Sequence, residues 1–232
     1  MKNIEEVFAK YNMPITKTQK NQFEQYFSML ITANKEFNLT AITEEQDVLI
    51  KHFLDSVLPE KLIPENAKIV DIGSGAGFPA LPLKILRPDL DVYMVDSLNK
   101  RVVFLQNVIN ELNLQKASAF HSRAEDFAKE HREMFDVAVA RAVAPLNTLV
   151  EYLLPFVKIG GAAIIYKSSK LDEEIAVAQN AIKILGAKIE KIADFHIEEQ
   201  DLNRKVLVLR KINTTPMKYP RGKNNPKLNP IK

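Results

Sequence analysis

The hydrophobic positions along the chain follow two different periods, and the change falls near residue 68. In the first part, apolar residues recur every three or four positions, as they do on one face of an α-helix. Thr16 can cap one such helix, whose apolar face would carry Phe23 and Phe27. Residues 43–46 have the form of a capping box for another helix. The first part is therefore predicted to be helical.

From residue 68 onward, short apolar runs alternate with helical patterns. The runs that indicate strands are Lys68–Ile72, Asp91–Val95, Ala117–His121, Phe135–Ala140 and Ala162–Tyr166. The helical patterns are Pro79–Leu86, Leu98–Leu112, Pro145–Val157 and Leu171–Leu185. Strands that alternate with helices of this length predict a mostly parallel sheet with helices on both faces.

Two further strand-like runs would close the sheet. Residues 188–195 and 205–210 follow each other with no helical pattern between them, which predicts a hairpin and an antiparallel last strand. The predicted fold is thus α/β and Rossmann-like, with seven strands. We expect a helical extension packed on the core at residues 1–64, the sheet domain at 65–211 and a basic, proline-rich, extended tail at 212–232.

Composition limits the available chemistry. The 232 residues are 46% hydrophobic, no run approaches the length of a membrane span, and the start lacks an apolar signal segment, so we expect a cytoplasmic protein. The chain has no cysteine, which excludes disulfides, thiolate metal sites and a cysteine nucleophile. Its four histidines are scattered without metal-ligand spacing, so no metal is expected.

The net charge of +3 hides an asymmetry along the chain. Residues 1–201 hold 23 Lys and Arg and all 29 Asp and Glu, a net charge of −6. Residues 202–232 hold nine Lys and Arg and no acidic residue, a net charge of +9. A basic end on an acidic body suggests contact with a polyanion, and a solubilising tail is the simpler alternative.

Three of the seven glycines fall within five residues, between a predicted strand and a predicted helix. They are Gly73, Gly75 and Gly77, and Asp71 precedes them in an acid-x-Gly-x-Gly-x-Gly pattern. A doubly wound sheet binds nucleotide-like ligands at this position, where glycine lets the backbone turn sharply and approach the ligand. The pattern is typical of loops that bind S-adenosyl-L-methionine (AdoMet). A dinucleotide-type register fits only from Gly75 to Ala80, and a purely structural turn is the third possibility.

Three more polar residues follow the ends of successive predicted strands. Asp96 lies about 20 residues after the loop, where an acid can accept hydrogen bonds from ribose hydroxyls. Glu125 follows the third strand, where an adenine edge would lie, although it could simply begin a helix. Arg141 ends the fourth strand as a cation that could meet a carboxylate, a phosphate or a base.

Together these motifs resemble the glucose-inhibited division protein B family, the bacterial RsmG enzymes. Members transfer a methyl group from AdoMet to N7 of a guanine in small-subunit ribosomal RNA. The matching segments are Phe37–Thr40, His52–Ser56, Asp71–Pro79, Asp96–Arg101, Ser122–Glu125 and Arg141–Ala142. The resemblance spans about residues 18–210 and implies a class I AdoMet-dependent methyltransferase fold.

The resemblance also implies roles for individual residues. The expected cofactor contacts are the loop glycines Gly73, Gly75 and Gly77, together with Phe78, Asp96, Ala124, Glu125 and Arg141. Asp71 would order the loop or meet the amino group of AdoMet. Residues 218–221 resemble a basic tail that some members carry, whereas the chain from Gly222 onward departs from that form.

The residues present are compatible with this chemistry. Carbon-5 pyrimidine methylation needs a cysteine, and adenine amino methylation typically uses an Asn/Asp-Pro-Pro-aromatic motif where this chain has Arg141 to Pro145. Guanine N7 carries a lone pair and no proton, so it needs no general base, and catalysis rests on alignment. Arg141 is the candidate catalytic residue, and a role in AdoMet binding is equally open.

RNA would meet the rim of the sheet through cations. The candidates are Lys100, Arg101, Arg123 and Arg141, together with Lys218 and Arg221 in the tail. The expected partner of a monomeric protein is 16S rRNA, in the small subunit or its assembly precursor. The alternatives are a methyltransferase for another RNA or a small molecule, a NAD-binding oxidoreductase and a non-catalytic assembly factor.

Overall fold

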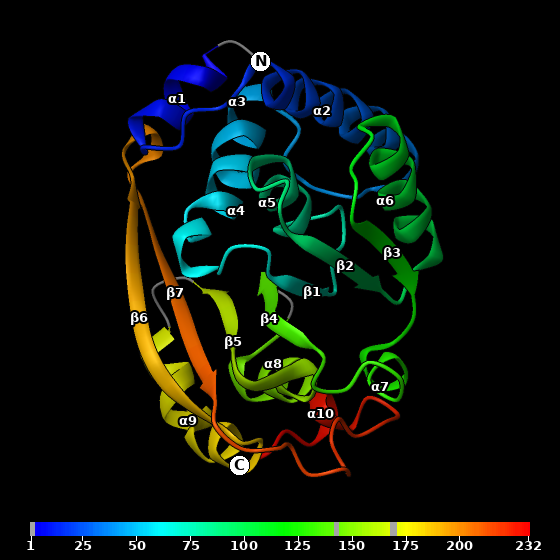
Figure 1. The fold of residues 1–232 in the computed structure, drawn as a ribbon, viewed down its shortest axis with the longest axis vertical. Coiled ribbons are helices and arrows are strands. Elements are labelled where there is room, and N and C mark those ends of the chain that lie inside the picture. The colour runs from blue at the N-terminus through cyan, green and yellow to red at the C-terminus, as the bar shows by residue number, and fades with distance from the viewer. Residues whose placement is uncertain (1–2, 142–143, 168–170) are drawn as a thin grey trace.

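A seven-stranded sheet forms the middle layer of the molecule, in a computed structural model that describes residues 3–141, 144–167 and 171–232 (Figure 1). The strands are β1 (Lys68–Ile72), β2 (Asp91–Asp96), β3 (Ala117–His121), β4 (Phe135–Arg141), β5 (Val157–Lys167), β6 (Ala187–Ile197) and β7 (Leu202–Lys211). Their order is β3-β2-β1-β4-β5-β7-β6, and β7 runs antiparallel to both of its neighbours. The predicted fold class is confirmed.

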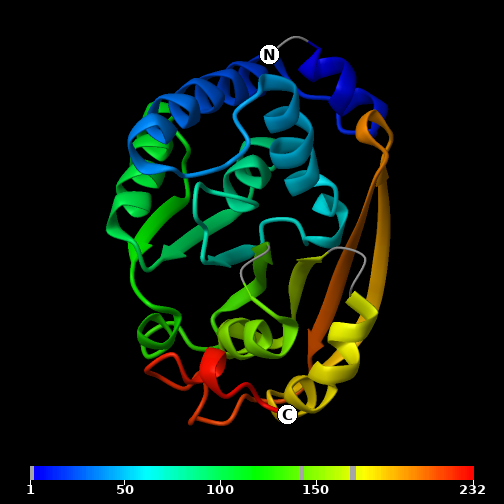
Figure 2. The same cartoon turned by 180° about the vertical axis from the view of Figure 1, so that it is seen from behind.

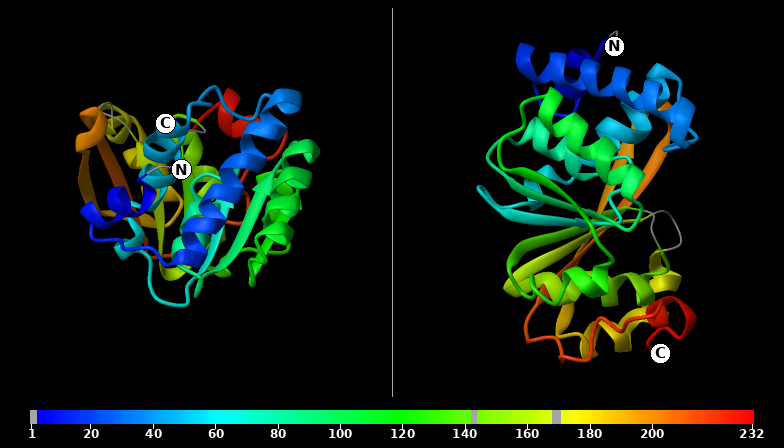
Figure 3. Two further views of the ribbon diagram at one scale, coloured as in Figure 1. Left: turned by 90° about the horizontal axis from the view of Figure 1, so that it is seen from above. Right: turned by 90° about the vertical axis from the view of Figure 1, so that its right-hand side faces the viewer.

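Helices cover both faces of the sheet (Figure 3). The α-helices between β1 and β6 are α5 (Ala80–Leu86), α6 (Asn99–Glu111), α7 (Ala124–Phe127), α8 (Leu146–Leu153) and α9 (Leu171–Ile184) in the part of the chain that the structure describes. Successive strand residues point to opposite faces, so Ile69 packs with α5 and α6 whereas Val70 packs with α7, α8 and α9. Each face of the sheet therefore has its own apolar core.

The boundary between α8 and β5 differs from the prediction. The helix predicted to reach Val157 ends at Leu153, because Pro155 lacks the N–H that would continue it. The chain then enters β5 five residues earlier than predicted. Short 3₁₀ turns occupy Glu60–Leu62, Leu154–Phe156 and Glu198–Gln200.

The N-terminal helices pack on the face of the sheet that carries α5 and α6 (Figure 2). They begin with α1 (Ile4–Lys10) and α2 (Lys17–Phe37). Thr16 caps α2 as predicted: Gln19 N–H donates to Thr16 Oγ1 at 3.3 Å, and Thr16 N–H donates to Gln19 Oε1 at 2.8 Å. The same apolar core therefore joins the N-terminal region to the sheet.

The next helical stretch changes type along its length. It consists of α3 (Glu45–Val48), a π-helical segment (Leu49–Leu54) and α4 (Asp55–Val57). Its N-cap is Glu44, which makes no side-chain capping bond, so the predicted capping box at residues 43–46 is wrong. Because the helix begins one residue later than predicted, the glutamine of the box stands at the second helical position, where it cannot complete the motif.

The C-terminal segment is less extended than its sequence suggests. It contains α10 (Asn225–Leu228) and lies along α8, and Tyr219 and Ile231 are buried in the core on that face. Thr148 Oγ1 on α8 donates to the carbonyl of Pro226 at 3.0 Å. Two apolar side chains and a hydrogen bond thus hold this basic segment on the domain.

Among the described helices, none is long and apolar enough to cross a membrane.

Tyr26 joins α2 to the glycine loop, because its buried hydroxyl donates to the carbonyl of Ala76 at 2.5 Å. Tyr26→Phe leaves that buried carbonyl without its partner, and we expect a loss of about 1–3 kcal/mol in the free energy of unfolding. Urea denaturation measures the loss, with Tyr93→Phe as the control from the other face of the sheet. An unchanged unfolding midpoint for Tyr26→Phe would contradict the predicted link.

Candidate functional site

The glycine loop turns sharply between β1 and α5. Gly73, Gly75 and Gly77 all have positive φ, at 76°, 59° and 102°. A Cβ atom at Gly77 would lie 2.8 Å from Leu81 Cγ and 2.9 Å from Tyr26 Oη, closer than such contacts allow. The loop therefore needs glycine at Gly77 for conformation and for space.

Asp96 at the end of β2 holds this loop in place. Its carboxylate is almost fully buried, and it accepts the N–H of Gly75 at 2.9 Å and the N–H of Leu98 at 2.9 Å. The first glycine is fixed separately, because Gly73 N–H donates to the carbonyl of Val95 at 2.8 Å. Asp96 thus couples the ends of β1 and β2, and its predicted contact with ribose stays a prediction.

Asp71 is the exceptional polar group beneath the loop. Its side chain is fully buried, and neither carboxyl oxygen has a hydrogen-bond partner in the described part of the chain. Burial raises the pKa of Asp71 well above its usual value, although the positive charge of the Arg141 guanidinium opposes the rise. A buried orphan carboxyl beside a glycine loop fits a site whose ligand brings a cationic or hydrogen-donating group.

A small pocket opens at the carboxyl ends of β1, β2 and β3. Its volume is about 160 Å³, and its lining is Ile72, Gly73, Val95, Ser97, Ser122, Arg123, Ala124, Glu125, Tyr152 and Asn224. Three predicted cofactor residues, Gly73, Ala124 and Glu125, therefore meet in one pocket. The volume is below that of a complete small-molecule site, so the pocket fits one end of an elongated ligand.

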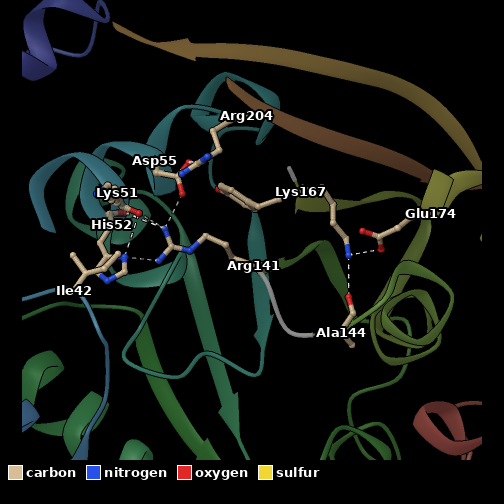
Figure 4. Close-up of a pocket in the computed structure, with 10 residues that line it drawn as sticks. Ile42, Lys51, His52, Asp55, Arg141, Ala144, Lys167, Glu174 and Arg204 are labelled. Carbon is tan, nitrogen blue, oxygen red and sulfur yellow. Dashed lines mark hydrogen bonds and ion pairs between the residues drawn. The ribbon is translucent and has the colours of Figure 1, made fainter. Parts of the chain in front are cut away.

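A larger cavity of about 660 Å³ lies at the ends of β4 and β5 (Figure 4). It is lined by Ile42, Lys51, His52, Asp55, Arg141, Ala144, Tyr166, Lys167, Glu174 and Arg204. The predicted residue Arg141 lies here and not in the smaller pocket. Phe78 lies under its guanidinium, at 4.9 Å from the ring centroid. Of the predicted cofactor residues, Gly73, Ala124 and Glu125 thus line the smaller pocket and Arg141 lines the larger cavity.

Arg141 is fixed by the N-terminal helices. Its Nη1 is 3.0 Å from Asp55 Oδ2 and donates to the carbonyl of Lys51 at 3.1 Å. The other Asp55 oxygen accepts from Arg204 Nε on β7 at 2.8 Å. Lys51 lies in the π-helical segment and Asp55 at the start of α4, so one continuous helical stretch supplies both contacts. These contacts keep the guanidinium of Arg141 in one orientation in the wall of the cavity.

His52 forms the wall beside Arg141. Its ring stacks on Phe78 with centroids 4.3 Å apart, and its Nε2 is 2.8 Å from Thr40 Oγ1. Burial, followed by the nearby charge of Arg141, lowers the pKa of His52 to about 4. The imidazole is therefore neutral at pH 7, and it adds no charge to the cations Lys51, Arg141, Lys167 and Arg204 that line the cavity.

Lys167 and Glu174 complete the far wall, and the sequence analysis did not identify them. Lys167 Nζ donates to the Ala144 carbonyl at 2.9 Å and to Glu174 Oε2 at 2.7 Å, and the same oxygen accepts the Leu146 N–H. The pair thus holds Ala144 and the first residue of α8, Leu146. Lys167 could have been found, because it ends a strand at the same edge of the sheet as Asp96 and Arg141.

The predicted RNA-binding cations differ in their surroundings. Lys100, Arg123 and Lys218 are exposed. Arg101 forms an ion pair with Asp96, with Nη1 3.4 Å from Oδ2. Arg221 is instead paired with Glu151, with Nη2 to Oε2 at 2.7 Å. Ala142, which carried part of the family resemblance, lies outside the described residues. Contact with RNA stays a prediction for all six candidates, including Arg141 in the larger cavity.

The described residues hold no group of three or more His, Asp or Glu side chains that could bind a metal ion.

The glycine loop, the acid at the end of β2 and the pocket at the carboxyl edge define a Rossmann-like fold of the class I AdoMet-dependent methyltransferases. M. jannaschii TYW2, solved in complex with AdoMet, has this fold with a TM-score of 0.57 and 15% identity, over 74% of this chain and 80% of that one. A SAM-dependent methyltransferase from Aquifex aeolicus matches with a TM-score of 0.54 and 16% identity, over 72% of this chain and 93% of that one.

The chain belongs to the rRNA small subunit methyltransferase G family, whose model matches residues 19–203. The ribosomal RNA small subunit methyltransferase G of Alkaliphilus metalliredigens is 47% identical over 222 residues, which cover 94% of this chain and 93% of that protein. The family resemblance carried by the sequence motifs is confirmed.

The depressed pKa of His52 predicts a loss of stability in mild acid. Between pH 6.5 and about 4 the unfolded chain binds a proton at this histidine and the folded chain does not, so stability falls as the pH falls. His52→Gln should remove up to about 2 kcal/mol of the difference in unfolding free energy between pH 7 and pH 4.5. Urea unfolding at both pH values measures it, with the exposed His196→Gln as control. Equal pH dependence in wild type and His52→Gln would contradict the assignment.

Proposed function

We propose that this protein transfers the methyl group of AdoMet to N7 of a guanine in 16S rRNA of the small ribosomal subunit. The observation that carries the proposal is the juxtaposition of two cavities at one sheet edge. One is bounded by the glycine loop, and the other holds a fixed arginine together with two carboxylates, Asp55 and Glu174, that are both engaged by cations. Membership of the methyltransferase G family supports the same reaction class.

The residues of the smaller site fit AdoMet. Ala124 and Glu125 would hold the adenine edge, Asp96 the ribose, and the orphan carboxyl of Asp71 the amino group, directly or through water. The glycine loop allows the backbone to approach the ligand closely. When bound, AdoMet supplies an electrophilic methyl group on a sulfonium, and the chain's task is to orient it toward the acceptor.

The larger cavity fits the acceptor base. Its volume of about 660 Å³ lies in the usual range for ligand sites. Arg141 has the donors to hold a guanine edge or a flanking phosphate, and Asp55 and the Lys51 carbonyl keep it in one orientation. Both Asp55 oxygens are engaged by guanidinium groups, so Asp55 is a poor proton acceptor. Guanine N7 requires no proton acceptor, and alignment can supply about 7–11 kcal/mol of the barrier reduction.

The RNA surface follows from the same geometry. The body of the chain has a net charge of −6, which disfavours general binding of polyanions. Lys100, Arg123 and Lys218 are exposed cations that can meet the phosphates of a folded target. We therefore expect the protein to recognise a defined rRNA structure, in the small subunit or its assembly precursor, with salt-sensitive affinity.

Transfer of labelled methyl from AdoMet to small ribosomal subunits tests the proposal. The subunits come from a strain that lacks this protein, and nuclease digestion identifies the modified base. We expect label in 7-methylguanine. Label in another nucleoside would overturn the assignment of the reaction. AdoMet binding without labelling of the subunits, of protein-free rRNA or of assembly precursors would overturn the assignment of the substrate.

Two substitutions separate the two cavities. Asp96→Asn should weaken AdoMet binding about ten- to a hundredfold, because it removes a charged hydrogen-bond acceptor. Arg141→Gln should leave AdoMet binding near wild type and lower methyl transfer, because the residue serves the acceptor. Equilibrium dialysis and single-turnover methylation measure the two effects, with the exposed Asp126→Asn as control. Weaker AdoMet binding in Arg141→Gln would instead place Arg141 in the cofactor site.

A further inference from the structure

The C-terminal segment is tied to α8 by a buried ion pair. We use the name C-terminal strap for residues 217–229. Glu151 on α8 is fully buried, and its Oε1 accepts from Arg221 N at 2.8 Å and from Nε at 2.9 Å, while Oε2 accepts from Nη2 at 2.7 Å. A two-pronged arginine–carboxylate pair of this kind fixes orientation as well as position.

Further contacts hold the strap on both sides of Arg221. Before it, Arg132 Nη1 donates to the Tyr219 carbonyl at 2.7 Å. After it, Thr148 Oγ1 donates to the buried Pro226 carbonyl at 3.0 Å. The strap therefore has a defined path over α8.

This path brings Asn224 to the smaller pocket. Asn224 lines that pocket together with Gly73, Ala124 and Glu125. Its Oδ1 accepts a hydrogen bond from Arg123 Nη1 at 3.0 Å. Its φ of 57° lies in the left-handed region, which asparagine tolerates better than most residues. A residue about 100 positions after Ala124 thus supplies part of the wall at this end of the pocket.

We propose that the C-terminal strap is part of the cofactor site, with the Arg221–Glu151 pair as its anchor and Asn224 as the wall beside the adenine end of AdoMet. This inference rests on the proposed assignment of the smaller pocket to AdoMet. Arg221 is then a positioning residue for the cofactor, because its pairing with the buried carboxylate of Glu151 holds the strap and so keeps Asn224 at the pocket. The exposed Lys218, Lys223 and Lys227 carry the charge of the strap that remains accessible to RNA.

Binding of AdoMet to the full-length protein without RNA tests the inference. Arg221→Gln releases the anchor, and Asn224→Gly removes the wall while keeping a residue that adopts positive φ. We expect each to raise the Kd for AdoMet about tenfold. Lys227→Ala, which removes an exposed charge from α10, should bind AdoMet as the wild type does. If Arg221→Gln does not fold, Asn224→Gly carries the test.

Hydrogen exchange supplies a readout that a purely structural role would not change. Because coupling between two binding events is reciprocal, AdoMet should slow amide exchange at residues 219–229 of the wild-type protein. Wild-type AdoMet affinity in Asn224→Gly, with no slowing of exchange in the strap, would overturn the inference and leave the proposed function intact. Failure of the wild-type protein to bind AdoMet would overturn the proposed cofactor site itself.

Discussion

The carboxylate of Asp55 joins three parts of the chain that meet only in the folded protein. It lies on α4, and it is paired with Arg141 at the end of β4 and with Arg204 on β7. Breaking a buried pair of this kind typically costs about 3–5 kcal/mol, because the remaining charges lose their partner. Asp55 therefore contributes both to the orientation of Arg141 in the larger cavity and to the contact of α4 with β4 and β7.

The sequence was most informative where the chemistry is local. The glycine loop and Asp96 are separated by about 20 residues, and a strand–loop–helix pattern is enough to place them at one edge of the sheet. Asp55, Lys167 and Glu174 could not be assigned in this way, because their partners lie on other elements. The π-helical turn was equally hidden, since it differs from an α-helix by one residue per turn and leaves the hydrophobic pattern almost unchanged.

The sequence predicts an extended tail because charged residues and prolines dominate residues 212–232, whereas the structure shows this segment packed on the domain. Its buried residues, Thr215, Tyr219, Pro226 and Ile231, are too widely spaced to form a periodic pattern, yet Tyr219 and Ile231 belong to the same apolar core as α8. The decisive partner of Arg221 is a glutamate 70 positions earlier, which looks like an ordinary exposed helix residue in the sequence. Basic composition therefore says little about which charges face solvent.

The burial of Glu151 also has a consequence for the order in which the chain acquires its structure during synthesis. Domains emerge from the ribosome with the N-terminal part first. Glu151 and the whole of α8 are translated well before Arg221, so this carboxylate has no partner while the strap is still being made. The surface of α8 on which the strap lies therefore reaches its final packing only after Arg221 has been made, and a nascent chain that stops short of Arg221 leaves this surface uncovered.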